Sequence, residues 1–575
     1  MKYSVIQILP YIFFTCFVFG QYPDSELLKG NETPTYEEMV DFYMDLAKNH
    51  DDIQVFNIGE SDYGLPIYLC MLGVEETYIK ALDEARKSTC VFINNAIHPG
   101  EPCGVNASMQ LALDFSQMTK SEKKNYPVVA ILTAYNVGGM KNRGKYSRVN
   151  QVGPEEYGFR GNAQNLDLNR DFVKMDSKNM FAFAAAFQAL DPDVFVDTHT
   201  TNGADYPYTI TYIPSIDEKY VSPISKLTYL SLIPYLEKSL TEKWGYKPYR
   251  YVNLVGSTPE EGIAEFDASP RYSMGYSDLF YTISFTTEAH MLKPFEDRVK
   301  ATYAFLNEIL AYAERNSDSI EKSKTAAIRA DQIREDFMIN AVLLGPVDSI
   351  VFEGYEAVYE TSKVTGAQRY YYDREKPYTK KVPFYTYEAI GNKIPIPSYY
   401  IVGAQEKDVI DRLKINGVEM TALTRDSVME VGIYEISDYK TLGHPYEGHY
   451  LHYDTEVNRK KRTVQLKKGD YIISTRQKRR KFIVYVLSPE SADSYFNWNF
   501  FDSYLQQKEH FSPYLFEETA EDILEESPHL KPEYAEYKFQ NLEVGDDPYK
   551  ELNYYYTRSK YYEKTHRVLP VYFID

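Results

Sequence analysis

The stretch Val91-Phe-Ile-Asn-Asn-Ala-Ile-His98-Pro-Gly-Glu101 gives the first indication of the architecture. An apolar run of strand type ends at His98, a Pro-Gly turn follows, and Glu101 stands just before the amphipathic run 105–115. This pattern predicts a buried strand, a turn and a helix. It places a histidine and a carboxylate at the carboxyl end of the strand, where open α/β sheets bind their ligands, and this pair of side chains suits zinc.

Strand and helix patterns alternate along the chain on either side of this stretch. Apolar strand runs at 127–135, 193–198 and 280–287 are separated by helical runs such as 177–190. Such alternation predicts an α/β fold with a mixed, mainly parallel sheet flanked by helices. The alternating pattern ends near residue 315.

The chain beyond residue 340 has a different pattern. Its strand-like runs are rich in Tyr, Val and Ile, and residues 497–526 are of helical type. We therefore expect a signal peptide (1–20), an α/β domain (21–315), a helical connector (316–340) and a β-rich accessory domain with a helical tail (341–575). The sequence does not indicate a role for the accessory domain.

The first twenty residues have the pattern of a signal peptide. Lys2 precedes an apolar run at 5–19, and the expected cleavage point lies near Gly20. The apolar run is too short and too interrupted for a membrane span, so we expect an exported, periplasmic or extracellular protein without a transmembrane span in its mature chain. Cys16 is an alternative lipid-attachment site, although the preceding Phe-Phe-Thr fits such a site poorly.

The charge balance is acidic, with 63 Lys and Arg against 83 Asp and Glu. This balance argues against nucleic acid as a partner. The other three cysteines, Cys70, Cys90 and Cys103, lack the number of a disulfide scaffold and the spacing of a metal cluster. Export without dependence on disulfides is more typical of a bacterial envelope protein than of a eukaryotic secreted one.

A second apolar strand also ends in a histidine, in Asp193-Val-Phe-Val-Asp197-Thr-His199. His199 would lie in the same crevice as His98 and Glu101 and supply a third ligand. Two histidines and one carboxylate leave one zinc position open for water, as catalytic sites do. Such a zinc lowers the pKa of bound water to roughly 7. We therefore expect one catalytic zinc ion per chain.

Two further elements provide the groups that a hydrolytic site needs. The strand 280–287 is followed by Glu288, which would act as the base for the water, although a glutamate at a strand end is often only a solvated residue. His290, two residues on, is expected to be structural or to support the site. In the polar segment between the ligands, Arg170 offers a planar fork for a substrate carboxylate, and Asn169 adds a donor and an acceptor.

Together these elements resemble the zinc metallocarboxypeptidases of the carboxypeptidase A type. The resemblance covers about residues 33–315 and rests on four short elements in the order found in that family, which are His98-Pro-Gly-Glu101, Asp167-Leu-Asn169-Arg170, His199 and Glu288. It implies a sheet of the eight-stranded type and zinc held by the two histidines and Glu101. It also implies Glu288 as general base and later proton donor, and a peptide substrate whose free C-terminal carboxylate is held by Asn169 and Arg170.

The resemblance also implies supporting roles. Asp167 matches an aspartate that orients a zinc histidine, here by preference His98. An arginine in the intervening loop would stabilise the oxyanion, and both Arg143 and Arg148 are candidates, with Arg148 preferred. This chain departs from the family at Gly100, where many members have an arginine before the zinc glutamate.

A mobile tyrosine expected in the loop before the base cannot be aligned securely, and Tyr272 and Tyr276 are both candidates. Arg271, in the same loop, would favour an acidic side chain on the substrate if it reaches the site, and is otherwise a surface residue.

The expected function is zinc-dependent hydrolysis of peptide bonds at substrate C-termini. A second hypothesis keeps the fold but takes a different amide, in a cell-wall peptide or an acylated amino acid. A third is a non-catalytic envelope protein that binds through the crevice and the tyrosine-rich accessory domain. The sequence leaves open the side-chain preference and the oligomeric state.

Overall fold

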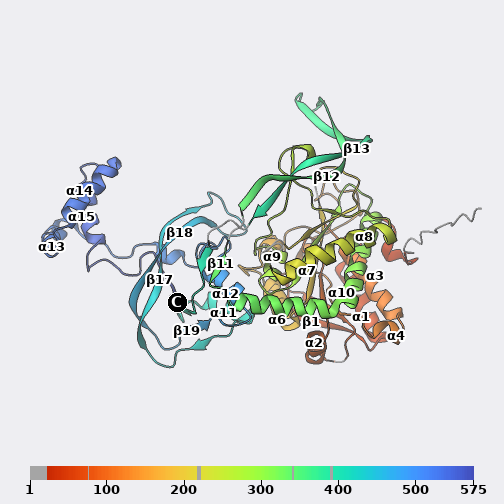
Figure 1. Cartoon of the computed structure of the whole chain (residues 1–575), viewed down its shortest axis with the longest axis horizontal. Coiled ribbons are helices and arrows are strands. Elements are labelled where there is room, and N and C mark those ends of the chain that lie inside the picture. Colours follow the sequence, from red (N-terminus) through yellow and green to blue (C-terminus); the bar gives the residue numbers. More distant parts are fainter. Residues whose placement is uncertain (1–21, 76, 202, 216–221, 340–341, 389–392) are drawn as a thin grey trace, which may run out of the picture. The chain divides into compact units, whose positions relative to one another are not determined.

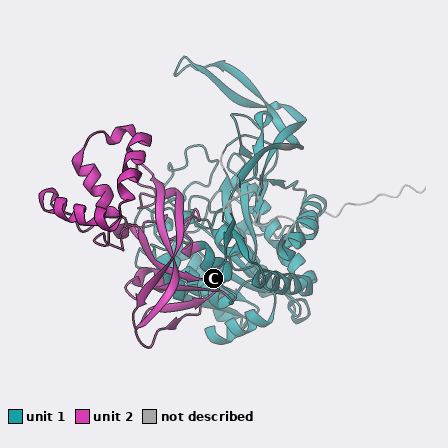
Figure 2. Cartoon of the chain, turned by 60° about the vertical axis from the view of Figure 1, so that its left-hand side comes forward, with its two compact units in different colours: residues 1–396, 412–418, 476–485 teal, residues 397–411, 419–475, 486–575 magenta. Residues whose placement is uncertain are grey.

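The computed structural model describes residues 22–75, 77–201, 203–215, 222–339, 342–388 and 393–575. It divides into two compact units (Figures 1 and 2). The first unit extends to residue 396 and includes two later segments, 412–418 and 476–485. The second unit contains 397–411, 419–475 and 486–575. The expected signal peptide and Cys16 lie outside the described residues.

A mixed sheet of eight strands, counted over the described residues, forms the centre of the first unit. The neighbours β4, β3, β5 and β10 run parallel, whereas β2 and β6 pair antiparallel with the two edges of this group. The predicted mixed, mainly parallel sheet is thus confirmed. In spatial order the strands are β1 (Ile53–Glu60), β2 (Pro66–Leu72), β4 (Val128–Leu132), β3 (Cys90–Asn94), β5 (Val194–Thr201), β10 (Ile283–His290), β6 (Ile210–Pro214) and β7 (Tyr249–Arg250).

Helices cover both faces of this sheet. Neighbouring residues of a strand point to opposite faces, so the buried strands present apolar side chains on each face for helices to cover. Phe195 of β5 packs against Phe187 of one helix, while Phe285 of β10, in register with Val196, packs against Phe305 of another. The helices of this region are α1 (Tyr36–Asn49), α2 (Tyr78–Lys87), α3 (Cys103–Gln117), α4 (Lys120–Lys123), α5 (Val137–Lys141), α6 (Lys178–Leu190), α7 (Pro223–Leu227), α8 (Ile233–Trp244), α9 (Ser273–Asp278) and α10 (Phe295–Gln332).

The expected connector at 316–340 begins inside a helix. α10 continues through the position where the sequence pattern suggested an end, with non-helical backbone angles only at Asn316 (φ −122°, ψ 19°). Ile320 and Ala327 in its second half are buried, so packing stabilises the continuation. Among the described residues, no helix is long and apolar enough to cross a membrane.

The first unit also contains a long hairpin, formed by β12 (Val342–Thr361) and β13 (Gln368–Glu388). β13 pairs with β9 (Ile263–Ala264), which pairs with β8 (Asn253–Leu254), so the hairpin joins the loop that precedes Glu288. Phe352 and Phe384 of the hairpin are buried in a cluster with Tyr206 and Tyr208. The first compact unit therefore extends past residue 340, where the sequence pattern changes, to residue 396, and it also includes 412–418 and 476–485.

The second unit is β-rich and carries helices towards its end, as predicted. Its sheet has the order β16 (Thr421–Ala422), β19 (Tyr471–Ser474), β15 (Tyr399–Val402), β20 (Val568–Ile574), β17 (Ser427–Thr441) and β18 (His452–Leu466). The C-terminal strand β20 thus lies inside the sheet, because it pairs with both β15 and β17. A smaller sheet of the first unit pairs β11 (Asp336–Met338) with β14 (Lys393–Pro395).

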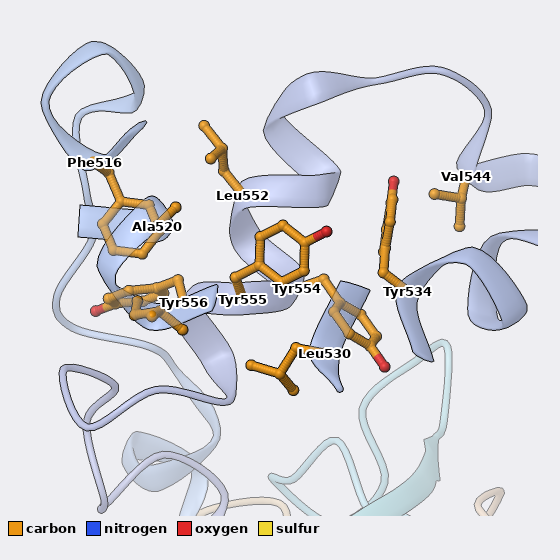
Figure 3. Packing of buried hydrophobic residues seen from close by; sticks show 10 residues of the cluster. Phe516, Ala520, Leu530, Tyr534, Val544, Leu552, Tyr554, Tyr555 and Tyr556 are labelled. Carbon is orange, nitrogen blue, oxygen red and sulfur yellow. The ribbon is translucent and has the colours of Figure 1, made fainter. Parts of the chain in front are cut away.

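The helical tail has a small core of its own, shown in Figure 3. The aromatic rings of Phe516, Tyr534, Tyr555 and Tyr556 pack with Leu552 in this core. Many of the chain's tyrosines here serve packing between helices. The helices of the later part of the chain are α11 (Lys407–Ile415), α12 (Arg480–Leu487), α13 (Pro513–Glu526), α14 (Leu530–Gln540) and α15 (Pro548–Thr557). The apolar run of α12, with its Val, Ile and Phe, has the composition of the strand-like runs predicted beyond residue 340, but it forms a helix.

Candidate functional site

The predicted polar residues follow or end three neighbouring strands of the central sheet. His98 and Glu101 follow β3, and His199 lies on β5. Glu288 lies on β10 opposite His199 in the parallel register. One ligand atom from each of His98, Glu101 and His199 lies within 4.8 Å of the other two, and all three side chains are buried. The structure therefore brings together the three predicted ligands.

The orientation of the two imidazole rings fits a metal ion. Nε2 of His98 lies 2.9 Å from Asp167 Oδ1, and Nε2 of His199 lies 3.0 Å from Asp197 Oδ2. The Nδ1 atoms face Glu101, at 3.3 Å for His98 and 3.1 Å for His199. Nδ1 of His98 is buried and has no hydrogen-bond partner among the described residues. Two inward-facing imidazole nitrogens and a carboxylate, with the outer nitrogens held by carboxylates, form a donor set that suits zinc.

Asp167 and Asp197 have equivalent positions beside the two histidines. Asp167 contacts His98, the histidine preferred from sequence. Burial alone would raise the pKa of Asp167, but His98 and the nearby guanidinium groups of Arg160 and Arg170 hold the pKa well below its ordinary value. Sequence analysis did not single out Asp197, although its spacing of two from His199 on a strand places both side chains on one face.

Arg148, one of the two predicted loop arginines, lies in the site and contacts a ligand. Its Nη1 donates to Glu101 Oε1 (2.6 Å) and its Nη2 to the Thr200 carbonyl (3.1 Å). A Cβ atom at Gly100 would lie 2.8 Å from Arg148 Cδ, so the glycine leaves the space that the arginine stem fills. Arg148 thus places a cation next to Gly100.

Arg143 is not brought into the site. Its guanidinium donates to the carbonyls of Thr33 (2.5 Å) and Pro34 (3.2 Å), and it is absent from the described residues that line the cavity. The structure instead adds Arg160, which sequence analysis did not select. Nε of Arg160 donates to Asp167 Oδ2 (2.9 Å), and the side chain is 46% exposed.

Asn169 and Arg170 also line the cavity, on a short 3-10 turn (Leu168–Arg170). The backbone N–H of Asn169 donates to Asp167 Oδ1, and its side-chain Oδ1 accepts from the backbone N–H of Ser273 (3.2 Å). The Arg170 guanidinium lies 4.3 Å from the centre of the Tyr272 ring. This cation–π contact orients both side chains towards the cavity.

The two candidate tyrosines have different environments. Tyr272 lines the cavity, whereas Tyr276 is fully buried and its hydroxyl donates to Asn416 Oδ1 (2.5 Å). This hydrogen bond and the burial leave Tyr276 without the freedom of a closing side chain. Arg271 does not occur among the described residues that line the cavity, whereas Tyr251, not anticipated from sequence, does.

Glu288 is half-buried and lines the same cavity. Burial raises the pKa of Glu288 to about 8; His199 opposes the shift, and the negative charge of Glu101 adds to it. His290 lies beyond the cavity, stacks on Tyr206 at 4.2 Å and contacts Asp205. The cavity measures about 160 Å³, and its further walls are formed by Thr200, Thr201, Ile213, Phe266, Ala268, Ser273, Met274 and Thr286.

No protein-family model matches the chain, and no curated protein matches it. Several solved structures are similar to it. A metallo-carboxypeptidase from Burkholderia cenocepacia has 17% identity and a TM-score of 0.37, covering 49% of this chain and 69% of that one. A metallo-carboxypeptidase from Pseudomonas aeruginosa has 14% identity and a TM-score of 0.37, covering 50% and 69%. Bovine thrombin-activatable fibrinolysis inhibitor has 14% identity and a TM-score of 0.35, covering 52% and 100%. At these values the likenesses carry no conclusion about activity.

Proposed function

We propose that this chain is a zinc-dependent carboxypeptidase that hydrolyses peptide bonds at the C-termini of its substrates. One observation carries the proposal: a single cavity contains three clustered donors, the half-buried carboxyl of Glu288 and the paired side chains of Asn169 and Arg170. The donors suit zinc, Glu288 suits a proton acceptor, and the pair suits a carboxylate. Export of the mature chain, inferred from the pattern of residues 1–20, is part of the same proposal.

The metal would be held by His98, Glu101 and His199. When bound there, zinc supplies Lewis-acid activation of a water molecule and of the scissile carbonyl. Asp167 and Asp197 keep a proton on the outer nitrogen of each histidine, so the inner nitrogens are free to coordinate.

Glu288 would accept the proton of the attacking water and return it to the leaving amine. Its raised pKa, about 8 without a metal ion, places the carboxyl in the range where a base and an acid are both effective near neutral pH. A cation bound beside Glu288 would lower this raised pKa. The carboxyl would then be ionised more often, and the ionised form is the one that accepts the proton.

Two arginines are available for the developing negative charge on the substrate oxygen. Arg148 already donates to Glu101 and to a backbone carbonyl, so its main contribution is to hold that ligand. Arg160 also lines the cavity and its side chain is more exposed than that of Arg148, so we assign to Arg160 the stabilisation of the oxyanion. This assignment replaces the preference for Arg148 from sequence.

Substrate recognition would rest on the terminal carboxylate. Arg170 offers two parallel N–H groups to it, and Asn169 adds one donor from its side-chain amide. Tyr272, stacked on Arg170, would keep the guanidinium plane in place.

The deciding experiment combines zinc analysis with a peptide panel. We expect one zinc per chain, release of the C-terminal residue from peptides with a free carboxylate, loss of activity with a chelator and no cleavage of the amidated peptides. Equal cleavage of amidated peptides would remove the role of Arg170 and favour a different amide substrate. Stoichiometric zinc with no hydrolysis of any peptide would favour a binding protein.

A further inference from the structure

We propose that Arg412, which is distant in sequence from every residue of the site, is a positioning residue for recognition of the substrate carboxylate. It would act by fixing the segment 171–176, directly after Asn169 and Arg170. The inference rests on the proposed function for the identity of the substrate. The contacts of Arg412 described below lie within the first compact unit, which includes residues 412–418.

The segment behind the carboxylate-binding pair contains an unusual buried charge network. Asp171 and Lys174 have no exposed side-chain surface, and Lys174 Nζ donates to Asp171 Oδ1 (2.9 Å) and Asp176 Oδ2 (2.6 Å). Asp171 also accepts hydrogen bonds from the backbone N–H groups of Asp176 (2.8 Å) and Ser177 (3.1 Å). Buried charges are tolerated only while each remains paired, so this segment needs one defined conformation.

The same segment has a backbone conformation that needs support. Met175 has a φ of 52°, in the left-handed region that residues with side chains rarely adopt. A turn of this kind persists only where its surroundings hold it. The support must come from groups that reach its carbonyls.

Arg412 supplies that support. Its Nε donates to the Lys174 carbonyl (2.6 Å) and its Nη2 to the Met175 carbonyl (3.0 Å). Nη2 also lies 3.4 Å from Asp176 Oδ1, and Arg412 is only 8% exposed. The rigid guanidinium fork thus bridges consecutive carbonyls of the left-handed turn and adds a positive charge to the network. A lysine ammonium cannot reproduce this geometry.

Asn416, one helical turn further, contacts both the segment 171–176 and Tyr276. Its Nδ2 lies 3.2 Å from Met175 Sδ, and its Oδ1 accepts from the Tyr276 hydroxyl. Tyr276 belongs to α9, whose first residue, Ser273, donates its backbone N–H to Asn169 Oδ1. Residues 412–416 therefore hold both elements between which Asn169 lies.

A positioning role has a kinetic signature that general destabilisation does not share. Loosening the segment would weaken binding of the carboxylate in the ground state and the transition state alike, which raises KM and leaves kcat nearly unchanged. The expected metal ligands follow β3 or lie on β5, outside the segment 171–176, so the zinc content should not change.

The test compares Arg412→Gln and Arg412→Lys with Arg480→Gln. Arg480 is a matched control, since it is 6% exposed and donates to the carbonyls of Gln332 (2.6 Å) and Arg334 (2.5 Å), away from the cavity. Each variant is measured for KM and kcat on a hexapeptide with a free C-terminus. The Kd of the same peptide is measured in the Glu288→Gln background, and hydrogen exchange is followed at 171–176.

For both Arg412 variants we expect KM and Kd to rise about tenfold or more, kcat to change little and exchange at 171–176 to increase. Arg480→Gln should change none of these values. If Arg412→Gln does not fold, the values measured for Arg412→Lys, which keeps the positive charge, decide whether the inference holds. Unchanged Kd in a folded Arg412 variant, or an equal rise in Arg480→Gln, overturns the inference. Failure of the wild type to cleave any peptide counts against the proposed function alone, because Kd still tests Arg412.

Discussion

Glu288 is the residue on which the proposed chemistry depends most directly. The variant Glu288→Gln keeps the shape of the side chain but removes the proton acceptor. We expect kcat to fall by about 10²- to 10⁴-fold, the usual contribution of a general base, with zinc content and folding unchanged. Steady-state kinetics with metal analysis on the same samples checks this. Wild-type turnover in the Gln variant would exclude Glu288 as the base.

The raised pKa of Glu288 also predicts how the metal-free protein responds to pH. The folded-state pKa of about 8 lies above the ordinary value of 4.5, so between these values the native state holds a proton that the unfolded state has lost. The native state is therefore destabilised as pH rises through this window. Glu288→Gln cannot ionise and should raise the Tm of the metal-free protein at about pH 9 but not at about pH 4. Equal Tm shifts at both pH values, in thermal unfolding with chelator, would contradict this.

Arg148 and Arg160 should separate in mutational experiments, because they hold Glu101 to different degrees. Arg148 Nη1 donates to Glu101 Oε1 at 2.6 Å, whereas Arg160 Nη1 lies 3.5 Å from that oxygen and its shorter contact is with Asp167. Arg148→Met removes a donor from Glu101 and should weaken zinc binding, whereas Arg160→Met should lower kcat and leave zinc bound. We expect the loss in kcat to be about 10²- to 10³-fold, typical of one lost oxyanion donor. Zinc affinity and kcat at saturating zinc distinguish the two. A loss of kcat in Arg148→Met alone would restore the assignment from sequence.

At the scale of elements, Asp205 links the long hairpin to the strand that carries Glu288. Its carboxylate accepts from Arg374 Nε of β13 (2.6 Å) and contacts His290 Nε2 of β10 (3.4 Å) and Lys293 Nζ (3.9 Å). Removing the Asp205 carboxylate leaves Arg374, His290 and Lys293 without this anion, and the His290 side chain is fully buried. The Asp205 side chain therefore joins the hairpin to β10, the strand that carries Glu288.

We expect Asp205→Ala to lower the free energy of unfolding by about 1–3 kcal/mol, the cost of leaving buried polar partners unsatisfied. Arg374→Met should cost less than about 1 kcal/mol, because the Arg374 side chain is 55% exposed and its ion pair is screened by water. Denaturant unfolding measures both. Equal losses in the two variants would show that only the Asp205–Arg374 pair matters and that His290 contributes nothing.

At the scale of the whole molecule, the first unit is completed by distant parts of the chain. Phe482 is fully buried with its ring 5.3 Å from that of Phe280, and residues 412–418 and 476–485 belong to the same compact unit. A chain that ends after residue 396 loses these contacts. We expect such a chain to be insoluble, or to melt well below the full-length protein, because its buried apolar surface would be exposed to water.

The control for this prediction replaces residues 513–557 with a flexible linker. These residues form the helical tail, which packs through a core of its own. The control should keep the melting behaviour of the first unit and its zinc content. A stable, zinc-binding fragment ending at residue 396 would show that the later segments are not needed, and scanning calorimetry distinguishes the two results.

The alternation of apolar strands with helices, and the polar residues at the strand ends, were predictable because both depend on local order. A strand period of two and the Pro-Gly turn after His98 determine where nearby side chains project. His98, Glu101, His199 and Glu288 were therefore identified from sequence, and the structure brings them together.

Only the tertiary structure decided which loop side chains join them. The segment from 141 to 170 has no period. The preference for Arg148 over Arg143 came with the resemblance, and Arg160 was not selected, whereas folding turns Arg143 towards residues 33–34 and both Arg148 and Arg160 into the cavity. The burial of Tyr276 and the inclusion of 412–418 in the first unit likewise depend on contacts between residues more than 100 positions apart. Such contacts arise from packing in three dimensions, which local patterns along the chain do not encode.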